Sequence, residues 1–364
     1  MTTITWAFAF AFGACVGSFL NVCIYRLPRS GLSVSRPRRS FCPSCGTAIR
    51  PRDNIPLVSW LWLRGRCIAC RSPISSRYFL VELFTAVVFV YLADRFLLPP
   101  GSGSPALFAV LAALVSALIV ASFIDLELRI IPDAITIRGM MVAPLLAVLV
   151  PELHPEAGKA LLGRWLRGFF DRLTATLPFQ LVGPGLWALA VVAGVVGFAL
   201  GLFGYLLYQR WVRPSASNRL KDGILGAVLL GTCAVIFTLG LLHPEWVLAP
   251  WFQSFWAAIA GMLVGSTLLL SVGVLGSKIF RKPAMGFGDV KLMGLLGAFA
   301  GWVGVIAGFF LACFLGSVVG IVVLLRSRSR YIPFGPFLAV GSLAWMLWPS
   351  AFQRILDWYL GLFR

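Results

Sequence analysis

A very long uncharged stretch of the chain runs from Leu292 to Leu325, 34 residues without a charged side chain. One straight helix of that length would extend about 51 Å at 1.5 Å per residue, well beyond the ~30 Å of hydrocarbon in a bilayer. We therefore predict two spans joined by a tight hairpin near Gly301, Trp302 and Gly304. A tract of this kind indicates a chain that is embedded in lipid.

Similar apolar tracts recur along the whole chain. The 364 residues are 59% hydrophobic and only 12% charged, a composition that excludes a soluble globular domain and indicates an all-α polytopic membrane protein. Each tract approaches the ~20 residues that a spanning helix needs. The ten predicted spans are 4–25, 79–98, 105–124, 134–150, 186–208, 224–242, 253–277, 290–302, 304–325 and 333–351.

The distribution of positive charge predicts the orientation of these spans. With the N-terminus outside, 24 of the 31 Lys and Arg fall in cytoplasmic loops, as the positive-inside rule requires. The net charge of +18 also raises the possibility of nucleic-acid binding. Because the basic residues are spread over loops, eleven of them between Arg26 and Arg77, we expect membrane lipids and no nucleic acid as partners.

One segment on the predicted outer side is unusual. Residues 159–177 combine apolar and basic residues at helical spacing, which is typical of a helix lying flat in the membrane interface. A solvated loop helix is the alternative.

The eight cysteines fall into two sets. Four lie in apolar tracts, where cysteine is usually a small buried side chain: Cys15, Cys23, Cys233 and Cys313. Four form two CxxC pairs with the spacing C-x2-C-x21-C-x2-C: Cys42, Cys45, Cys67 and Cys70. Two such turns supply the four thiolates of a closed, structural Zn²⁺ site. Two disulfides are the alternative, which a cytoplasmic location disfavours.

Carboxylates are rare, 13 in all, so those at the ends of apolar tracts are informative. Asp125 closes the uncharged tract 96–124, and Asp289, in the segment GFGDVKL, opens the predicted eighth span. The predicted orientation puts both at the cytoplasmic face, where ionisable groups are usually paired or functional. Structural roles are the alternative: Asp289 as a helix cap, and Asp125 in an ion pair with Arg129 one helical turn away.

Two carboxylates in one site titrate as a coupled pair, so that one keeps a proton while the other acts as a base on water. This is the chemistry of aspartic proteases, which needs neither a metal nor a covalent intermediate. Glycines at 286 and 288 allow the backbone to bend and to approach a substrate strand. We predict Asp125 and Asp289 as the catalytic pair.

Three further charged residues lie near span ends. Lys291 either neutralises the carboxylate pair or anchors its span at the headgroups. Glu82 lies about one turn inside the second predicted span, where snorkelling toward the basic loop is the alternative to a functional role. Asp133 follows Pro132 and is a candidate cap of the fourth span.

The motifs resemble, in the same order along the chain, those of the type IV prepilin peptidases, bifunctional leader peptidases and N-methyltransferases of bacterial inner membranes. They cover most of residues 13–139 and 253–345. The matching segments are GSFLNVCIYRLPR (17–29), CPSC (42–45), NIPLVSWLWLRGRCIAC (54–70), SSRYFLVEL (75–83), IDLELRIIPD (124–133), GFGDVKL (286–292) and IPFGPFLAVG (332–341).

The resemblance implies a GxGD-type aspartyl protease in which Asp125 and Asp289 are catalytic and the four loop cysteines bind zinc. It implies prepilin and pseudopilin substrates, whose short basic leader ends in Gly and is cleaved at the cytoplasmic face of the inner membrane. It also implies methylation of the new amino terminus, usually Phe, from S-adenosylmethionine. Glu82 and the N-terminal loop are the candidate methyl-transfer site.

The expected organisation has eight family-like spans and two inserted ones. Residues 151–248 lack a counterpart in the family's usual pattern, and the even number of added spans leaves later loops on their original face. The expected parts are a first span (1–25), a cytoplasmic tetracysteine zinc loop (26–78), spans with the first catalytic Asp (79–150), an insertion with an interfacial helix and two spans (151–248), and spans with the GxGD motif (249–364).

Two other classes of function remain open at this point. A transporter or channel that relays protons or cations through membrane aspartates accounts for Asp125 and Asp289 but not for the cysteines. A non-catalytic scaffold that uses the zinc loop to hold a partner accounts for the cysteines but not for the aspartates.

Overall fold

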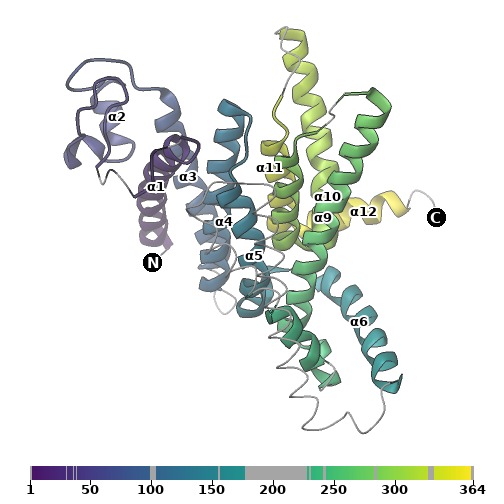
Figure 1. Ribbon diagram of the computed structural model, residues 1–364. Coiled ribbons are helices and arrows are strands. Elements are labelled where there is room, and N and C mark those ends of the chain that lie inside the picture. Colours follow the sequence, from purple (N-terminus) through teal and green to yellow (C-terminus); the bar gives the residue numbers. More distant parts are fainter. Residues whose placement is uncertain are drawn as a thin grey trace. The chain divides into compact units, whose positions relative to one another are not determined.

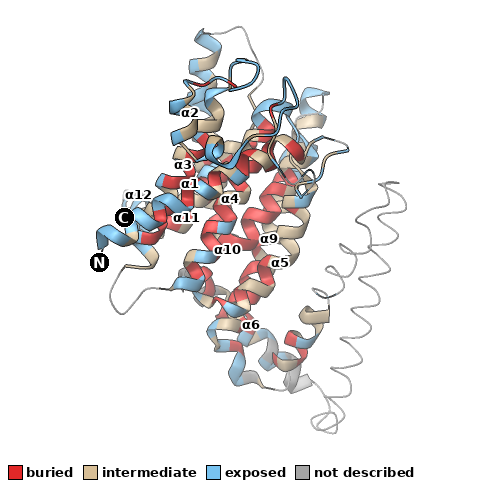
Figure 2. Cartoon of the chain, turned by 90° about the vertical axis from the view of Figure 1, so that its left-hand side faces the viewer, coloured by how far each residue is buried: buried red, intermediate tan, exposed pale blue. Residues whose placement is uncertain are grey.

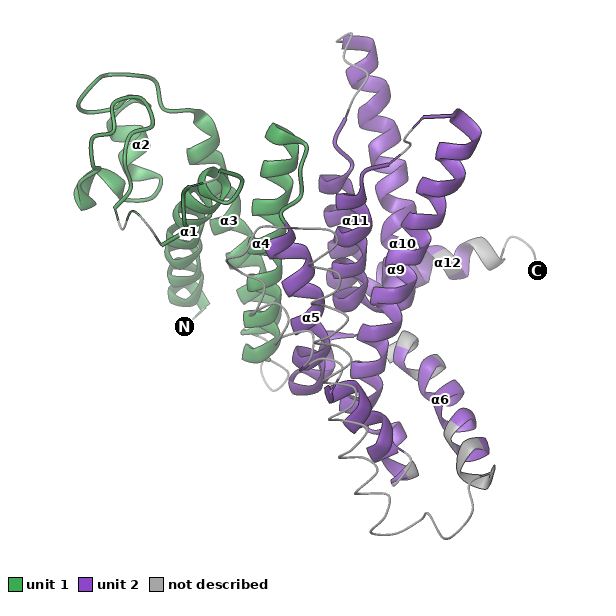
Figure 3. Cartoon of the chain, in the orientation of Figure 1, with its two compact units in different colours: residues 1–132 green, residues 133–364 purple. Residues whose placement is uncertain are grey.

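The computed structural model describes residues 2–29, 31–35, 37, 39–98, 104–154, 156–176, 228, 231–240, 243–282, 285–326 and 332–361. Within these residues the regular secondary structure is helical, and isolated β-bridges join Phe41 to Ala48 and Arg66 to Pro73 in the tetracysteine loop. The predicted all-α class is therefore confirmed. The chain divides into two compact units, residues 1–132 and 133–364 (Figure 3).

The first unit contains three long helices and the tetracysteine loop between the first two of them (Figure 1). Its elements are α1 (Thr2–Arg26), the 3-10 turn η1 (Pro51–Asn54), the short α2 (Val58–Trp62), α3 (Ser76–Phe96) and α4 (Pro105–Leu128).

The second unit is built around two long helical elements, α9 and α10 (Figure 1). Its elements are α5 (Asp133–Leu149), η2 (Pro151–Leu153), α6 (Glu156–Thr176), the helix Gly231–Gly240, η4 (Pro244–Leu248), α9 (Pro250–Phe280), α10 (Phe287–Arg326), α11 (Gly335–Leu347) and α12 (Pro349–Gly361).

Two glycines four residues apart bring α1 and α3 into close contact. A Cβ atom on Gly13 would lie 2.8 Å from Ala86 Cα, and one on Gly17 would lie 2.7 Å from Glu82 Cα. Only glycine permits such an approach of two backbones, and this spacing is a recurrent packing motif of membrane helices. The contact places Glu82 directly against α1.

The hairpin predicted within 292–325 is present. Gly301 in α10 has φ 74° and ψ 172°, a backbone conformation that breaks the helix there and that favours glycine. A Cβ on Gly265 of α9 would contact both Met293 O at 2.4 Å and Val305 Cγ2 at 3.0 Å. Because residues before and after the break meet the same position on α9, the chain reverses direction at Gly301.

The second half of α10 packs on α11 in the same close manner. A Cβ on Gly304 would lie 2.4 Å from Trp345 Cδ1, and one on Gly308 would lie 2.8 Å from the Ser342 backbone. Small residues at four-residue spacing thus join helices in both units.

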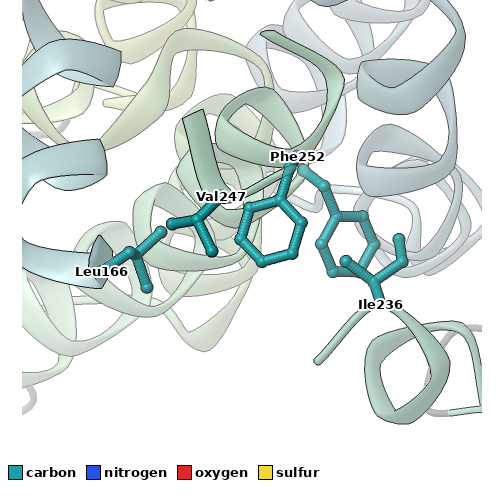
Figure 4. Close-up of a cluster of buried hydrophobic side chains, with 5 residues drawn as sticks. Leu166, Ile236, Val247 and Phe252 are labelled. Carbon is teal, nitrogen blue, oxygen red and sulfur yellow. The ribbon is translucent and has the colours of Figure 1, made fainter. Parts of the chain in front are cut away.

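A cluster of apolar side chains attaches α6 to the start of α9. Figure 4 shows Val247 and Phe252 between Leu166 of α6 and Ile236 of the helix Gly231–Gly240. All of these side chains are at least nine-tenths buried. Residues 159–176 are therefore helical as predicted, while the placement of this helix flat in a membrane interface stays a prediction.

Within the part of the chain that the structure describes, four helices are long and apolar enough to cross a bilayer: α1, α4, α9 and α10. Many of their large apolar side chains are exposed, among them Phe8 at 72% and Phe310 at 68% (Figure 2), as expected of surfaces that face lipid. The structure supports a multi-pass membrane protein. Ten spans and the outside N-terminus stay predictions, and the predicted span 186–208 lies outside the described residues.

Candidate metal centre and active site

The four loop cysteines converge in the first unit. The Sγ atoms of Cys42, Cys45, Cys67 and Cys70 all lie within 4.8 Å of one another, and Cys42 Sγ is 3.9 Å from Cys70 Sγ. A tetrahedral site with Zn–S bonds of about 2.3 Å has sulfur–sulfur distances of about 3.8 Å. All four are free thiols, so the donor set fits a single closed metal site rather than two disulfides.

Each CxxC pair is held by the same backbone turn. The amide of Gly46 donates to Cys42 O at 2.9 Å, and the amide of Arg71 donates to Cys67 O at 3.0 Å. Gly46 and Arg71 both have positive φ, 70° and 59°. Each turn is closed by an isolated antiparallel β-bridge, between Phe41 and Ala48 in the first turn and between Arg66 and Pro73 in the second. The repeated geometry explains how two distant sequence segments present equivalent thiols.

The first thiol of the set is easily ionised. Burial of Cys42 opposes the thiolate, but hydrogen bonds from the backbone amides of Cys45 and Ser44 outweigh burial and lower its pKa from 9.0 to about 6. A thiolate is the form that coordinates a metal, so the turn prepares Cys42 as a ligand.

Arg26, which the sequence analysis did not single out, organises the chain before the first CxxC turn. It is 4% exposed at the end of α1, and its guanidinium donates to the carbonyl oxygens of Ser33, Val34, Pro37 and Arg39 at 2.8–3.3 Å. The signal in the sequence was an arginine that ends the first apolar tract directly before the basic loop.

Glu82 does not snorkel toward solvent. Its side chain is buried, and Oε2 accepts a hydrogen bond of 2.7 Å from the main-chain amide of Leu57. Leu57 is the residue before α2 and has φ 65°. Glu82 therefore fixes the tetracysteine loop to α3, which is a structural role that the sequence did not indicate.

Asp125 lies in the last turn of α4 and is 6% exposed. Its carbonyl oxygen accepts a hydrogen bond of 2.9 Å from the amide of Arg129, which ends the helix with φ 58°. The neighbouring Glu127 forms an ion pair with Arg77 at the start of α3. The predicted acid is thus a buried side chain at a helix terminus.

Asp289 lies in the first turn of α10 in the second unit and is half-buried. Its amide donates to Gly286 O at 3.2 Å, which forms the turn before the helix. Asp125 and Asp289 belong to different units, so their pairing stays a prediction.

Lys291 forms an ion pair with Asp133. Lys291 Nζ lies 2.8 Å from Asp133 Oδ1, and the two side chains are 16% and 15% exposed. Asp133 is the first residue of α5, so the pair joins the start of α5 to the start of α10. The partner of Lys291 is thus Asp133, the residue predicted from the sequence as a helix cap.

The glycines of the GFGD segment do not work through positive φ. Neither Gly286 nor Gly288 is among the described glycines with left-handed backbone. A Cβ on Gly286 would lie 3.4 Å from Asp289 Oδ2, which is ordinary van der Waals contact. The absence of a side chain at Gly286 therefore keeps the space beside the carboxylate open.

Helices of bilayer-spanning length and acidic residues at helix ends define a multi-pass membrane protein. Its tetracysteine loop forms a small lobe whose four thiols fit a metal ion. The family model described as Bacterial Peptidase A24 N-terminal domain matches residues 11–96, which include all four cysteines. The model of the type IV leader peptidase family matches residues 219–321, which include Asp289. Asp125 lies outside both matched ranges.

Full-length relatives give the same result. The prepilin leader peptidase/N-methyltransferase of Aeromonas salmonicida is 30% identical over 98% of this chain and 94% of its own length. Its counterpart in Aeromonas hydrophila is 31% identical over 98% and 93%, and that of Pseudomonas putida 30% identical over 92% and 88%. The chain belongs to the type IV leader peptidase family. No solved structure matches it.

The range matched by the peptidase model begins at residue 219, inside the segment 151–248 that was predicted as an insertion. The relatives also align over nearly the whole chain. That this segment is an insertion with two added spans stays a prediction.

Proposed function

We propose that this protein removes the basic leader of type IV prepilins and pseudopilins after Gly and then N-methylates the new amino terminus. The observation that carries the proposal is the similarity over 98% of the chain to proteins named prepilin leader peptidase/N-methyltransferase. That similarity extends across both the GFGDVKL segment and the tetracysteine loop.

For the cleavage step we assign Asp125 and Asp289 as the acid–base pair. The ionised carboxylate takes a proton from water while the water oxygen attacks the carbonyl carbon of the scissile peptide bond. The protonated carboxyl donates to the carbonyl oxygen. Collapse of the tetrahedral intermediate breaks the C–N bond, and the amine leaves with a proton from the pair.

The helix positions of the two aspartates suggest which one carries the proton. Asp289 lies at the N-terminal end of α10, where the helix dipole stabilises a negative charge. Asp125 is buried at the C-terminal end of α4, where both the dipole and the loss of hydration favour the neutral form. We assign Asp289 as the base and Asp125 as the acid.

The tetracysteine loop has a structural role in this proposal. Four sulfur ligands leave no open coordination position, so a bound Zn²⁺ would cross-link the two CxxC turns without contacting substrate. The lobe holds few buried apolar residues, and metal binding supplies folding free energy to such small segments.

The cellular location follows from the same orientation rule as the spans. We place the protein in the bacterial inner membrane with its N-terminus outside, so that the basic loop, Asp125 and Asp289 face the cytoplasm. A prepilin whose apolar helix lies in the bilayer then presents its leader at that face.

The methyl-transfer step uses S-adenosylmethionine. Methyl carbon moves from the sulfonium sulfur to the uncharged amine, the C–S bond breaks, and S-adenosylhomocysteine leaves as a neutral thioether. Glu82 and the N-terminal loop are the proposed region of this step.

The alternatives gain less support. A transporter or channel accounts for Asp125 and Asp289 but leaves the metal centre without a role. The relatives reported above are named for peptidase and methyltransferase activities, and a non-catalytic scaffold accounts for neither.

The test is incubation of the full-length protein in lipid nanodiscs with a prepilin and S-adenosylmethionine, followed by mass measurement of the product. We expect loss of the leader and gain of one methyl group. Asp125→Asn and Asp289→Asn should each abolish cleavage, while the exposed Asp94→Asn should cleave at the wild-type rate. Cleavage by either Asn variant at the wild-type rate overturns the assignment of the pair.

A further inference from the structure

A cavity of about 360 Å³ lies entirely within the first unit, between α1, α3 and the tetracysteine loop. Its size is within the range of small-molecule sites in proteins, about 300–1,000 Å³. Cys42 and Cys67 form part of one wall, while Asn21 and Glu82 belong to the wall formed by the helices.

Two of the residues that line this cavity carry a buried acceptor atom without a hydrogen-bond partner among the described residues: Asn21 Oδ1 and Asp53 Oδ2. Asn21 is 2% exposed, and its amide group is oriented by a hydrogen bond of 3.0 Å from Nδ2 to Tyr78 O. A buried acceptor without a donor lowers stability. Such an atom is satisfied when a bound water or a ligand donates to it.

The charges of the cavity favour a ligand that carries positive charge and N–H donors. Asp53 and Glu82 are carboxylates, and Arg26 is the single Lys or Arg among the lining residues of the described chain. The Arg26 guanidinium is already engaged with backbone carbonyl oxygens. A ligand that carries negative charge alone, such as a phosphate, would meet two carboxylates and no uncommitted cation.

Aromatic rings supply the remaining wall. Tyr25, Phe41, Trp60 and Tyr78 all line the cavity, and Trp60 is fixed by a hydrogen bond from Nε1 to Ile74 O at 3.3 Å. Aromatic faces stack on planar heterocycles and attract cations. A purine ring with an exocyclic amino group and a sulfonium cation matches this combination of rings and acceptors.

We propose that this cavity is the S-adenosylmethionine site, with Asn21 Oδ1 and Asp53 Oδ2 as acceptors for the ligand's amino groups. The inference rests on the proposed methyltransferase function and adds to it the location of the donor and two residues that hold it. It places methyl-donor binding in the lobe of the first unit, on residues that play no part in peptide cleavage.

The test measures binding separately from activity. S-adenosylhomocysteine, which has no methyl group to transfer, is titrated calorimetrically into the full-length protein in nanodiscs. Asn21→Leu and Asp53→Asn should each raise its Kd about tenfold or more, the effect of one lost hydrogen bond to a buried group. Asp94→Asn, a matched charge change on the exposed end of α3, should leave Kd unchanged.

Zinc content and leader cleavage serve as controls for folding of the variants. Variants that keep the wild-type metal content and cleave prepilin, but bind S-adenosylhomocysteine weakly and transfer little methyl, support the site. If methylation and binding stay at the wild-type level in both variants, the site is elsewhere and the proposed function stands. If the wild-type protein neither binds S-adenosylhomocysteine nor methylates, the cavity holds water only, and both the site and the methyltransferase function are overturned.

Discussion

The main-chain amide of Leu57 donates a 2.7 Å hydrogen bond to Glu82 Oε2, so one carboxylate of α3 holds the start of α2 within the tetracysteine loop. Leu57 has φ 65° and ψ −50°, a conformation that a non-glycine residue keeps only when its surroundings enforce it. The first amides of a helix also lack partners within the helix. Glu82 therefore determines both the position of the loop and the wall of the cavity below it.

Removing this carboxylate should loosen the loop. In Glu82→Ala the partly buried amide of Leu57 loses its acceptor, at a cost of about 1 kcal/mol or more. We expect faster hydrogen exchange of the amides in residues 55–63, measured by mass spectrometry on the full-length protein. Glu82→Gln keeps an oxygen acceptor and should exchange more slowly than the Ala variant. Equal exchange in the two variants contradicts an anchoring role.

The ion pair between Lys291 and Asp133 should contribute to the stability of the second unit. Both side chains are about five-sixths buried, and breaking a buried pair by removing one partner costs up to about 3–5 kcal/mol because the other charge stays uncompensated. We expect Lys291→Met and Asp133→Asn each to lower the thermal stability of the protein in detergent. The double variant should lose less than the sum of the two.

The exposed pair of His243 and Glu245 provides the control for this cycle. Its side chains are 36% and 66% exposed, so Glu245→Gln should change stability by less than about 1 kcal/mol. Strict additivity of the Lys291 and Asp133 changes argues that the two groups do not interact in solution.

Close helix packing predicts a large effect of one methyl group. A Cβ on Gly261 would lie 2.0 Å from Gly297 O, so Gly261→Ala must separate α9 from α10. We expect marked destabilisation, of the order of 1–3 kcal/mol or more for an overpacked site. In Gly168→Ala the added Cβ meets no atom within 4 Å, and the exposed part of α6 should gain up to about 1 kcal/mol. Similar stability of the two variants contradicts the observed contact.

His154 should make stability dependent on pH. Its ring lies at 2.8 Å from Ser254 Oγ through Nδ1 and at 3.2 Å from Ala298 O through Nε2. A carbonyl oxygen only accepts, so Nε2 carries the proton of the neutral ring. Burial lowers the pKa of His154 to about 4, and the nearby Lys159 acts in the same direction.

The direction of the pH effect follows from this depressed pKa. Below about pH 6.5 the unfolded histidine takes up a proton while the folded one stays neutral until about pH 4. The stability that is present above pH 6.5 is therefore lost as the pH falls toward 4, by at most roughly 3 kcal/mol. Melting temperatures between pH 4 and 8 should show a steeper acid decline for the wild type than for His154→Gln.

Metal removal should affect both the lobe and the cavity beside it. We expect about one zinc per chain, lost in a Cys67→Ser, Cys70→Ser double variant and kept in Cys313→Ser, whose thiol lies in α10 outside the cluster. Because Cys42 and Cys67 line the cavity, a chelator should also weaken binding of S-adenosylhomocysteine. Full affinity in the metal-free protein shows that the cavity keeps its shape without zinc.

Several features of the protein could be predicted from local sequence alone. Apolar length predicted membrane helices at α1, α4, α9 and α10, and the absence of charge over 292–325 predicted the reversal at Gly301. Cysteine spacing predicted the convergence of the four loop thiols. These predictions succeeded because each depends on residues that are close in the chain and on a physical limit, such as bilayer thickness or the geometry of a CxxC turn.

Long-range pairings required the tertiary structure. No pattern indicated that Glu82 accepts from Leu57, that Lys291 pairs with Asp133 across 158 positions, or that Asn21 and Asp53 face one cavity. The partner of a polar side chain depends on where folding places that side chain. This placement depends on contacts between helices, such as those at glycines, rather than on neighbours in sequence. The residue types and their helices were thus determined by the sequence, whereas their partners were decided by packing.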